Sequence, residues 1–172
     1  MKVDNVSLGN YVGYSGKVKV SLSCNGSTRE VLLTNSGTKT LWNTIAKALA
    51  GYNISNEVPK YFDMVDSNGT SLLINKILFR GTVWGEEVDN STESTSVRLT
   101  ATVTSTDKLL STLSGGRQCN LRMYSASGKN HMAQISDTQD GVLRELYNTI
   151  NVGTNAIFEW TLTFSNKSSE VY

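Results

Sequence analysis

The segment Ser96–Thr104 alternates strictly between apolar and polar residues, and this pattern constrains the fold more than any other in the chain. Alternation with period two predicts a strand that places one face on a core and the other in solvent. The segment Ala156–Phe164 repeats the pattern. The predicted core-facing residues of these two strands are Val97, Leu99, Ala101, Val103, Ala156, Phe158, Trp160, Leu162 and Phe164.

Shorter segments with strand character precede and follow these two. Lys17–Leu22 and Arg29–Thr34 flank an Asn25-Gly26 turn, which predicts a hairpin. Further strands are expected over residues 60–66, 71–74, 77–84, 118–124 and 131–135. Residues 86–95 are acidic, rich in Ser and Thr and without a period, so they predict a mobile loop between two strands.

One segment has a clear helical pattern. The helix is expected to begin at Thr38 or Thr40 and to end at Gly51, a residue suited to a left-handed C-terminal cap. Its apolar stripe consists of Leu41, Ile45, Ala48 and Leu49, and Trp42 is expected to cover the same core. A short helix is also expected over residues 106–113. Residues 141–150 fit a helix better than a strand, although residues 149–152 can also pair as a strand.

Together these elements predict a mainly β fold, an antiparallel β-sandwich or flattened barrel with one or two short α-helices packed on it. A chain of 172 residues is most simply one domain. We expect residues 17–165 to form this domain. Residues 1–16 are expected to be an N-terminal arm, either extended or an irregular first strand, and residues 166–172 a polar C-terminal tail.

The composition argues against several classes of partner. Sixteen Lys and Arg against fifteen Asp and Glu give a net charge of +1, and no large basic cluster occurs, so nucleic acid is not an expected partner. No apolar run is long enough to span a bilayer, and the N-terminus has no secretory signal, so we expect synthesis in a cytosol. Cys24 and Cys119 are expected to be small core residues, with a disulfide between them left open.

Residues that could carry chemistry are few and scattered. His131 is the single histidine and is expected at the edge of a turn. Asp63 and Asp66 would point to opposite faces of one strand, so they do not form an acid–base pair. Glu86 and Glu87 are expected on a solvated loop, where they, Asp89 and Glu93 offer at most a weak calcium site. The sequence therefore predicts a protein that is not an enzyme and uses no cofactor or metal.

Aromatic residues are the better candidates for function. Trp160 alternates with other apolar residues and is expected in the core, whereas Trp84 stands at a strand end and is expected at the surface. Apolar residues near chain ends often bury against a neighbouring subunit, although simple fraying is an equal alternative. The residues expected at an interface are Tyr11, Tyr14, Trp84, Val171 and Tyr172.

Three segments carry a resemblance to small virion structural proteins of tailed bacteriophages: Gly37-Thr38-Lys39-Thr40-Leu41-Trp42-Asn43, the aspartate-flanked Lys60–Asp66, and Gly153–Trp160. The resemblance implies a non-enzymatic, multi-copy component that decorates the capsid or belongs to a head fibre or tail attachment. Such a component is made in the bacterial cytoplasm and then resides in the virion, bound to copies of itself and to other virion proteins. The alternatives are a carbohydrate-binding module that stacks a glycan on Trp84, and a hydrolase that rests on Asp63, Asp66, Glu86 and Glu87.

Overall fold

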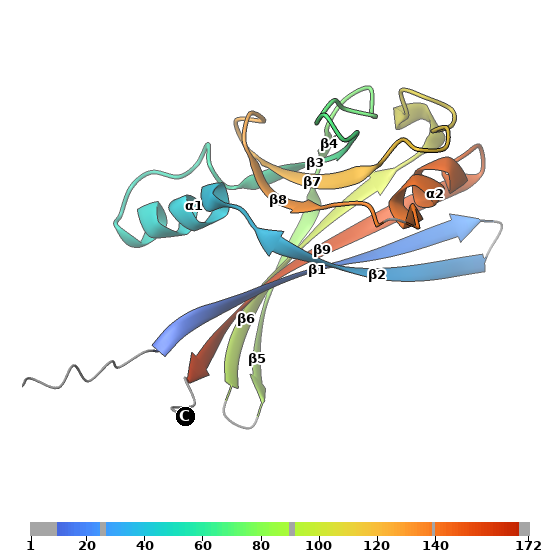
Figure 1. Cartoon of the computed structure of the whole chain (residues 1–172). Helices are drawn as coiled ribbons and strands as arrows, with labels where there is room; N and C mark the ends of the chain where they lie inside the picture. Colours follow the sequence, from blue (N-terminus) through green and yellow to red (C-terminus); the bar gives the residue numbers. More distant parts are fainter. Residues whose placement is uncertain (1–9, 25–26, 90–91, 139, 169–172) are drawn as a thin grey trace, which may run out of the picture.

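The computed structural model describes residues 10–24, 27–89, 92–138 and 140–168. This part of the chain holds nine strands, two α-helices and one 3-10 turn (Figure 1). The strands are β1 (Asn10–Cys24), β2 (Ser27–Gly37), β3 (Pro59–Val65), β4 (Ile77–Leu78), β5 (Arg80–Asp89), β6 (Thr92–Val103), β7 (Asn120–Ser125), β8 (His131–Ile135) and β9 (Thr154–Ser168). The helices are α1 (Lys39–Leu49) and α2 (Val142–Thr149), and the 3-10 turn is η1 (Ser105–Asp107).

The strands form two antiparallel sheets that pack as a β-sandwich, as the sequence predicts. Sheet A has the order β2-β1-β9-β6-β5, and sheet B consists of β4, β3, β7 and β8. Strand β2 belongs to both, because it pairs with β1 along most of its length and then with β8 at Ser36 and Gly37. On the opposite side, only Phe79 separates β4 of sheet B from β5 of sheet A. Strands that pass from one sheet to the other form both corners of the sandwich.

The core lies between the two sheets and follows the alternation read from the sequence. Phe158 and Trp160 of β9 are fully buried, as are Phe62 and Met64 of β3 in the facing sheet. The rings of Phe62 and Phe158 meet across the layers with their centroids 4.5 Å apart. Every predicted core residue from Leu99 to Val103 and from Ala156 to Leu162 is buried. Period-two patterning thus determines which face of these strands packs.

The two helices lie at opposite ends of the sheet B layer (Figure 1). Helix α1 contacts β2 and β8, but of its expected apolar stripe only Leu41 is buried. Trp42 is 40% exposed and Leu49 86% exposed, so the prediction that Trp42 covers the core is wrong. Helix α2 buries Leu143, Leu146 and Tyr147, which settles this segment as helix. Neither helix has the length and apolar character required to span a bilayer in the described part of the chain.

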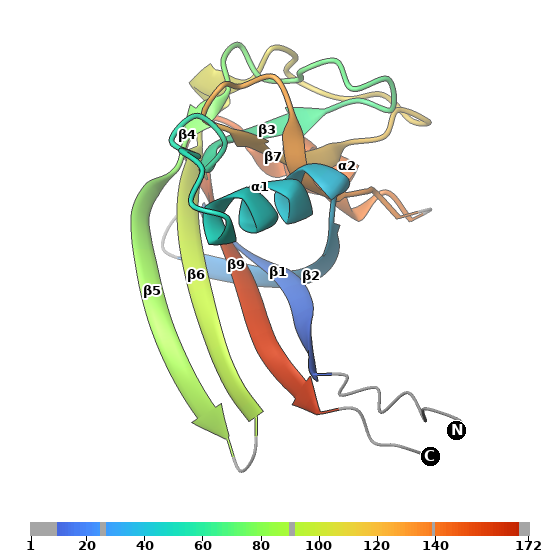
Figure 2. The ribbon, with the colours of Figure 1, turned by 90° about the vertical axis from the view of Figure 1, so that its left-hand side faces the viewer.

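Sheet A extends beyond the sandwich. Pairing of β2 with β1 ends at Gly16, and from Ser15 outward only four strands continue, in the order β1-β9-β6-β5. We call this part, residues 10–15, 163–168, 92–96 and 85–89, the projecting sheet. Figures 1 and 2 show it leaving the body of the molecule, and none of the described residues forms a second layer opposite it. It is the feature that most distinguishes this molecule from a simple sandwich.

Several boundaries differ from the predictions. Residues 86–95, expected to be a loop, instead continue β5 to Asp89 and begin β6 at Thr92. Strand β1 already starts at Asn10 and β9 continues to Ser168, so residues 10–16 and 166–168 belong to sheet A. The helix expected over residues 106–113 is only the turn η1, and residues 71–74 make isolated bridges through Ser71 and Leu73. Cross-strand pairing overrides weak local patterning at each of these sites.

Candidate interaction surfaces

Asp63 is buried in sheet B, where its carboxyl accepts a hydrogen bond that stabilises the fold. Its side chain, on the outer side of β3, is only 1% exposed and accepts a hydrogen bond of 2.7 Å from the Ser71 hydroxyl. Burial raises the pKa of this carboxyl, while the Ser71 hydrogen bond and the charge of Lys76 oppose that rise. The Ser71 hydroxyl also lies 2.9 Å from the Leu73 carbonyl. This carboxyl therefore fastens the segment after β3 to the strand.

The other candidate carboxylates do not join Asp63 in a site. Asp66 accepts two backbone hydrogen bonds of 2.9 Å, from Asn68 and Thr70, and so stabilises the turn after β3. Glu86 and Glu87 occupy register positions in the projecting sheet, opposite Thr95 and Ser94. Within the described residues no three His, Cys, Asp or Glu side chains gather in a way that could hold a metal ion.

His131 and Cys119 also have structural surroundings. The centroids of the His131 and Tyr124 rings lie 6.3 Å apart in an edge-on contact, and the Thr38 hydroxyl lies 3.1 Å from the His131 backbone carbonyl and 2.8 Å from that of Met132. Burial, together with the positive charge of Arg122, lowers the pKa of His131. Cys119 is a free, fully buried thiol whose pKa is raised by burial. A buried, protonated thiol is a poor nucleophile.

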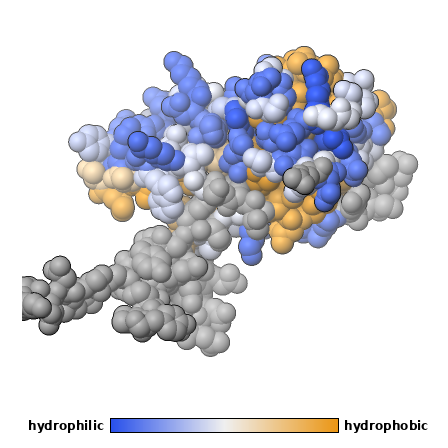
Figure 3. Space-filling view, viewed as in Figure 1, coloured by the Kyte–Doolittle hydropathy of each residue, from blue (hydrophilic) through white to orange (hydrophobic). Residues whose placement is uncertain are grey.

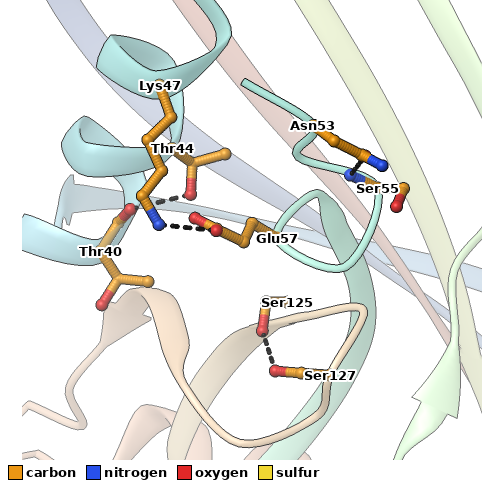
Figure 4. A network of polar contacts seen from close by, with 8 residues as sticks. All are labelled: Thr40, Thr44, Lys47, Asn53, Ser55, Glu57, Ser125 and Ser127. Atoms are coloured by element: carbon orange, nitrogen blue, oxygen red, sulfur yellow. Dashed lines mark hydrogen bonds and ion pairs between the residues drawn. The ribbon is translucent and has the colours of Figure 1, made fainter.

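A polar pocket of about 290 Å³ lies between α1, the loop that follows it and the turn joining β7 to β8. Lys47 and Glu57 form an ion pair of 2.6 Å at this site, and the Ser125 and Ser127 hydroxyls lie 2.8 Å apart (Figure 4). Backbone hydrogen bonds from Ala126 to Val58 and from Ser127 to Asn56 fix the loop against the turn. The lining residues are all hydrophilic: Thr40, Asn43, Lys47, Asn56, Glu57, Ser125, Ser127 and Asn130.

A wider notch of about 470 Å³ lies at the corner where the chain passes from β4 to β5. Thr100, Thr102 and Thr104 line it with alternate residues of β6, and Lys76 and Arg80 line the other side. Its carboxylate, Asp107, already accepts hydrogen bonds from the backbone and hydroxyl of Thr104. The Lys76 ammonium lies 4.8 Å from the centroid of the Tyr124 ring. These groups are therefore partly committed to contacts within the fold.

The apolar surface is uneven. Figure 3 shows a mostly hydrophilic body with exposed apolar residues in separate patches, one at the end formed by α1 and others toward the opposite end. Leu49 and Tyr52 are the most exposed large apolar residues in and just after this helix, at 86% and 69%. Sequence reasoning missed this feature because Leu49 matches the helical spacing of Leu41 and Ile45. The helix lies on the end of the sandwich and buries a narrower stripe than the pattern indicates.

The projecting sheet contains Tyr11 and Tyr14, two of the five residues expected at an interface, and a third, Trp84, lies in the row that adjoins it. The register places Tyr14 opposite Phe164 and Trp84 opposite Val97, on neighbouring rows of strands β1, β9, β6 and β5. Directly opposed residues of antiparallel strands share one face. These two rows continue the face that carries Trp160 and Leu99, and Val97 and Phe164 still pack against the core as partly buried residues.

The remaining expected interface residues are less well placed by the structure. Tyr11 pairs with Lys167 three residues further out along the same two strands, so it lies on the opposite face of the sheet from the Tyr14 row. The structure describes only the backbone of Tyr11, Tyr14 and Trp84, while Val171 and Tyr172 lie outside the described residues. The placement of Tyr14 and Trp84 on one face of the same sheet had no signal in the sequence, because it depends on β9 and β6 lying between β1 and β5.

Among the described residues the arrangement thus includes a polar pocket, a polar notch and a sheet that leaves the body with no second layer opposite it. Comparison with known proteins gives no further guide: no family model matches the chain, and no curated protein or solved structure is detectably similar to it.

Proposed function

We propose that this protein is a non-enzymatic structural subunit that assembles with other protein chains through its projecting sheet. The observation that carries the proposal is that four strands of sheet A continue past Gly16 with no facing layer among the described residues. Their outermost strands, β1 and β5, also lack a neighbour on one side there. Exposed strand edges and uncovered sheet faces are surfaces that proteins commonly complete with another chain.

The energetics of a sheet support this proposal. A strand pair that packs against nothing is marginally stable in water, because backbone hydrogen bonds alone contribute little net free energy. A partner that covers the face or pairs with an edge would supply the missing apolar burial. The row Gly16, Leu162, Val97 and Trp84 and the row Tyr14, Phe164, Thr95 and Glu86 adjoin the core and would be the first to gain from such a partner.

The candidate chemical residues favour a structural role over catalysis. Asp63 and Asp66 use their carboxylates to hold the segment after β3, and Cys119 is buried as a thiol. The resemblance to small virion proteins of tailed bacteriophages supports a particle component as the biological setting. In that setting the partners are copies of this chain and other virion proteins, and the location is the head or tail of the virion.

Light scattering coupled to size-exclusion chromatography tests the assembly proposal. The full-length protein should form a concentration-dependent oligomer. A variant lacking residues 1–15 should remain folded, because pairing of β1 with β2 begins only at Gly16, but should lose the oligomer. The proposal would be contradicted by a full-length chain that stays monomeric at every concentration and also forms no complex with candidate virion proteins.

The polar pocket beside α1 favours carbohydrate binding as a second candidate function. Its hydroxyl, amide and paired charged groups suit the hydroxyls of a neutral sugar, and its volume of about 290 Å³ admits one sugar ring. A glycan array with the purified protein tests this candidate. Saturable binding that is lost in Asn43→Ala and Asn130→Ala variants would support it. Binding that survives both substitutions would exclude the pocket.

A further inference from the structure

We infer that two copies of this chain pair through the open edge of β1, at residues 10–15, to form a symmetric dimer with one continuous sheet. The inference rests on the proposed function and specifies its geometry. The sheet of the dimer would run in the order β5-β6-β9-β1 and then, in the second copy, β1-β9-β6-β5. Three observations carry it: the length of the open edge, its lack of charge, and the charge on the opposite edge.

The first observation is the open edge itself. Strand β1 pairs with β9 over its whole length, from Asn10 to Cys24. On its other side it pairs with β2 only from Gly16 to Cys24. Residues 10–15 therefore have no described neighbour on that side. In an antiparallel ladder alternate residues direct their N–H and C=O groups to the same side, so about three of these six residues offer both groups to a partner.

The second observation is the composition of this edge. The six residues Asn10, Tyr11, Val12, Gly13, Tyr14 and Ser15 include no charged residue and no proline. Charged side chains and proline are the usual means by which natural proteins prevent an edge strand from pairing with another chain. Tyr and Val are also favoured in strands. The edge of β1 therefore lacks the features that would keep it unpaired.

The third observation is the contrast with β5, the other edge of the projecting sheet. This strand carries Glu86, Glu87 and Asp89, and the paired part of β6 begins with Thr92 and Glu93. Two such edges would place like charges opposite one another, which is unfavourable. The edge of β1 offers no positive charge at residues 10–15 to attract the acidic edge. Pairing of β1 with β1 thus avoids both problems.

Symmetry makes this pairing self-consistent. A two-fold axis perpendicular to the sheet relates two copies of one edge strand in an antiparallel manner, the same arrangement that β1 already has with β9. The contact closes on itself, so it yields a dimer and not a filament. Val12 and Gly13 lie at the middle of the six-residue edge and would fall closest to the same residues of the second copy.

Charge substitutions at Val12 test this geometry in the full-length protein. Val12→Lys and Val12→Glu each place like charges near the two-fold axis, so each should weaken dimerisation by about tenfold or more in sedimentation velocity experiments. An equimolar mixture of the two variants, one carrying a size tag, should form a heterodimer about as strong as the wild-type dimer. Val88→Lys on the acidic β5 edge is the matched control and should dimerise like the wild type.

Amide hydrogen exchange of the unmodified chain provides a second measurement that does not depend on a variant folding. Exchange at residues 10–15 should slow as protein concentration rises, and exchange at residues 85–89 should not change. A dimer that persists in both Val12 variants, or concentration-dependent protection confined to residues 85–89, would overturn the inference. Equal weakening by Val88→Lys would assign the contact to β1 with β5. A wild-type chain that stays monomeric on its own would also overturn the inference. Only a chain that stays monomeric in the presence of candidate virion partners as well would contradict the proposed function.

Discussion

Tyr147 joins helix α2 to two separate loops from a fully buried position. Its hydroxyl lies 2.9 Å from the carbonyl oxygens of Leu72 and Leu110 and accepts a hydrogen bond of 3.1 Å from the Leu110 amide. The ammonium of Lys108 lies 4.4 Å from the centre of the same ring and donates hydrogen bonds to the Ser111 and Ile150 carbonyls. Polar side chains thus satisfy backbone groups where the chain has no regular structure.

The first prediction concerns the Tyr147 hydroxyl. Tyr147→Phe keeps the shape of the ring but leaves the partly buried Leu110 amide without its acceptor. We expect the free energy of unfolding in urea to fall by about 1–3 kcal/mol. Tyr124→Phe is a matched control, because no hydrogen bond joins that hydroxyl to a described residue, and it should change stability by less than about 0.5 kcal/mol. Equal losses in the two variants would contradict the role given to Tyr147.

The second prediction concerns the pH dependence contributed by Asp63. Burial raises its pKa in the folded protein above the usual 3.8, so the folded state binds more protons than the unfolded state between these two values. The contribution of Asp63 to stability therefore falls as pH rises through this window. In Asp63→Asn the free energy of unfolding should decline less, or rise more, between about pH 4 and pH 7 than in the wild type. Parallel curves for the two proteins in urea titrations would contradict the assignment.

At the scale of the element, cross-strand pairing explains both the successes and the failures of sequence-based prediction. Strands β6 and β9 could be predicted because each packs one face on the core, which imposes strict alternation on Leu99 to Val103 and Ala156 to Leu162. The projecting sheet has no layer opposite it to impose such a pattern. Glu86–Thr95 consequently has the composition of a loop, although register pairs it as a hairpin.

Helix α2 depends on a carboxylate that lies outside it. Gly141, the residue before the helix, has a left-handed backbone with φ of 68° and supplies no capping side chain. The Asp137 carboxylate caps the helix instead, because it accepts hydrogen bonds from the Leu143 and Arg144 amides at 2.9 and 3.2 Å. The same carboxylate accepts a third from the Cys119 amide. This side chain therefore couples the start of α2 to the segment that precedes β7.

The third prediction tests that coupling. Asp137→Ala removes the acceptor for three backbone amides, and we expect it to lower the free energy of unfolding by about 1–3 kcal/mol. Asp137→Asn retains one oxygen acceptor and should lose less. Chemical denaturation followed by far-UV circular dichroism measures both. If the two variants are as stable as the wild type, the helix does not need this cap.

At the scale of the whole molecule, the sandwich is held by core contacts that end near Gly16, while sheet A continues. The sequence predicts the β-sandwich because its core strands carry the pattern. Predicting the projecting sheet would have required the strand order, since Tyr14, Phe164 and Trp84 are far apart in sequence and are brought onto neighbouring rows only by β9. The polar pocket beside α1 is equally invisible in the sequence, because the β7–β8 turn that completes it is far in sequence from α1 and the loop that follows the helix. Sites assembled by long-range pairing leave little local signal.

The last prediction separates folding of the body from the outer end of the projecting sheet. Replacing Glu86–Thr95 with Asn-Gly joins Gly85 to Ser96, which are already paired, through a tight two-residue turn. The register places the described residues of this segment in the projecting sheet, which has no facing layer among the described residues, so we expect a cooperative thermal transition within about 5 °C of the wild type. The dimer should also persist, because β9 and β6 separate this hairpin from the β1 edge. Loss of cooperative melting would show that the hairpin stabilises the sandwich. Loss of the dimer alone would place the second copy on β5 and β6, since the β1 edge is intact in this variant.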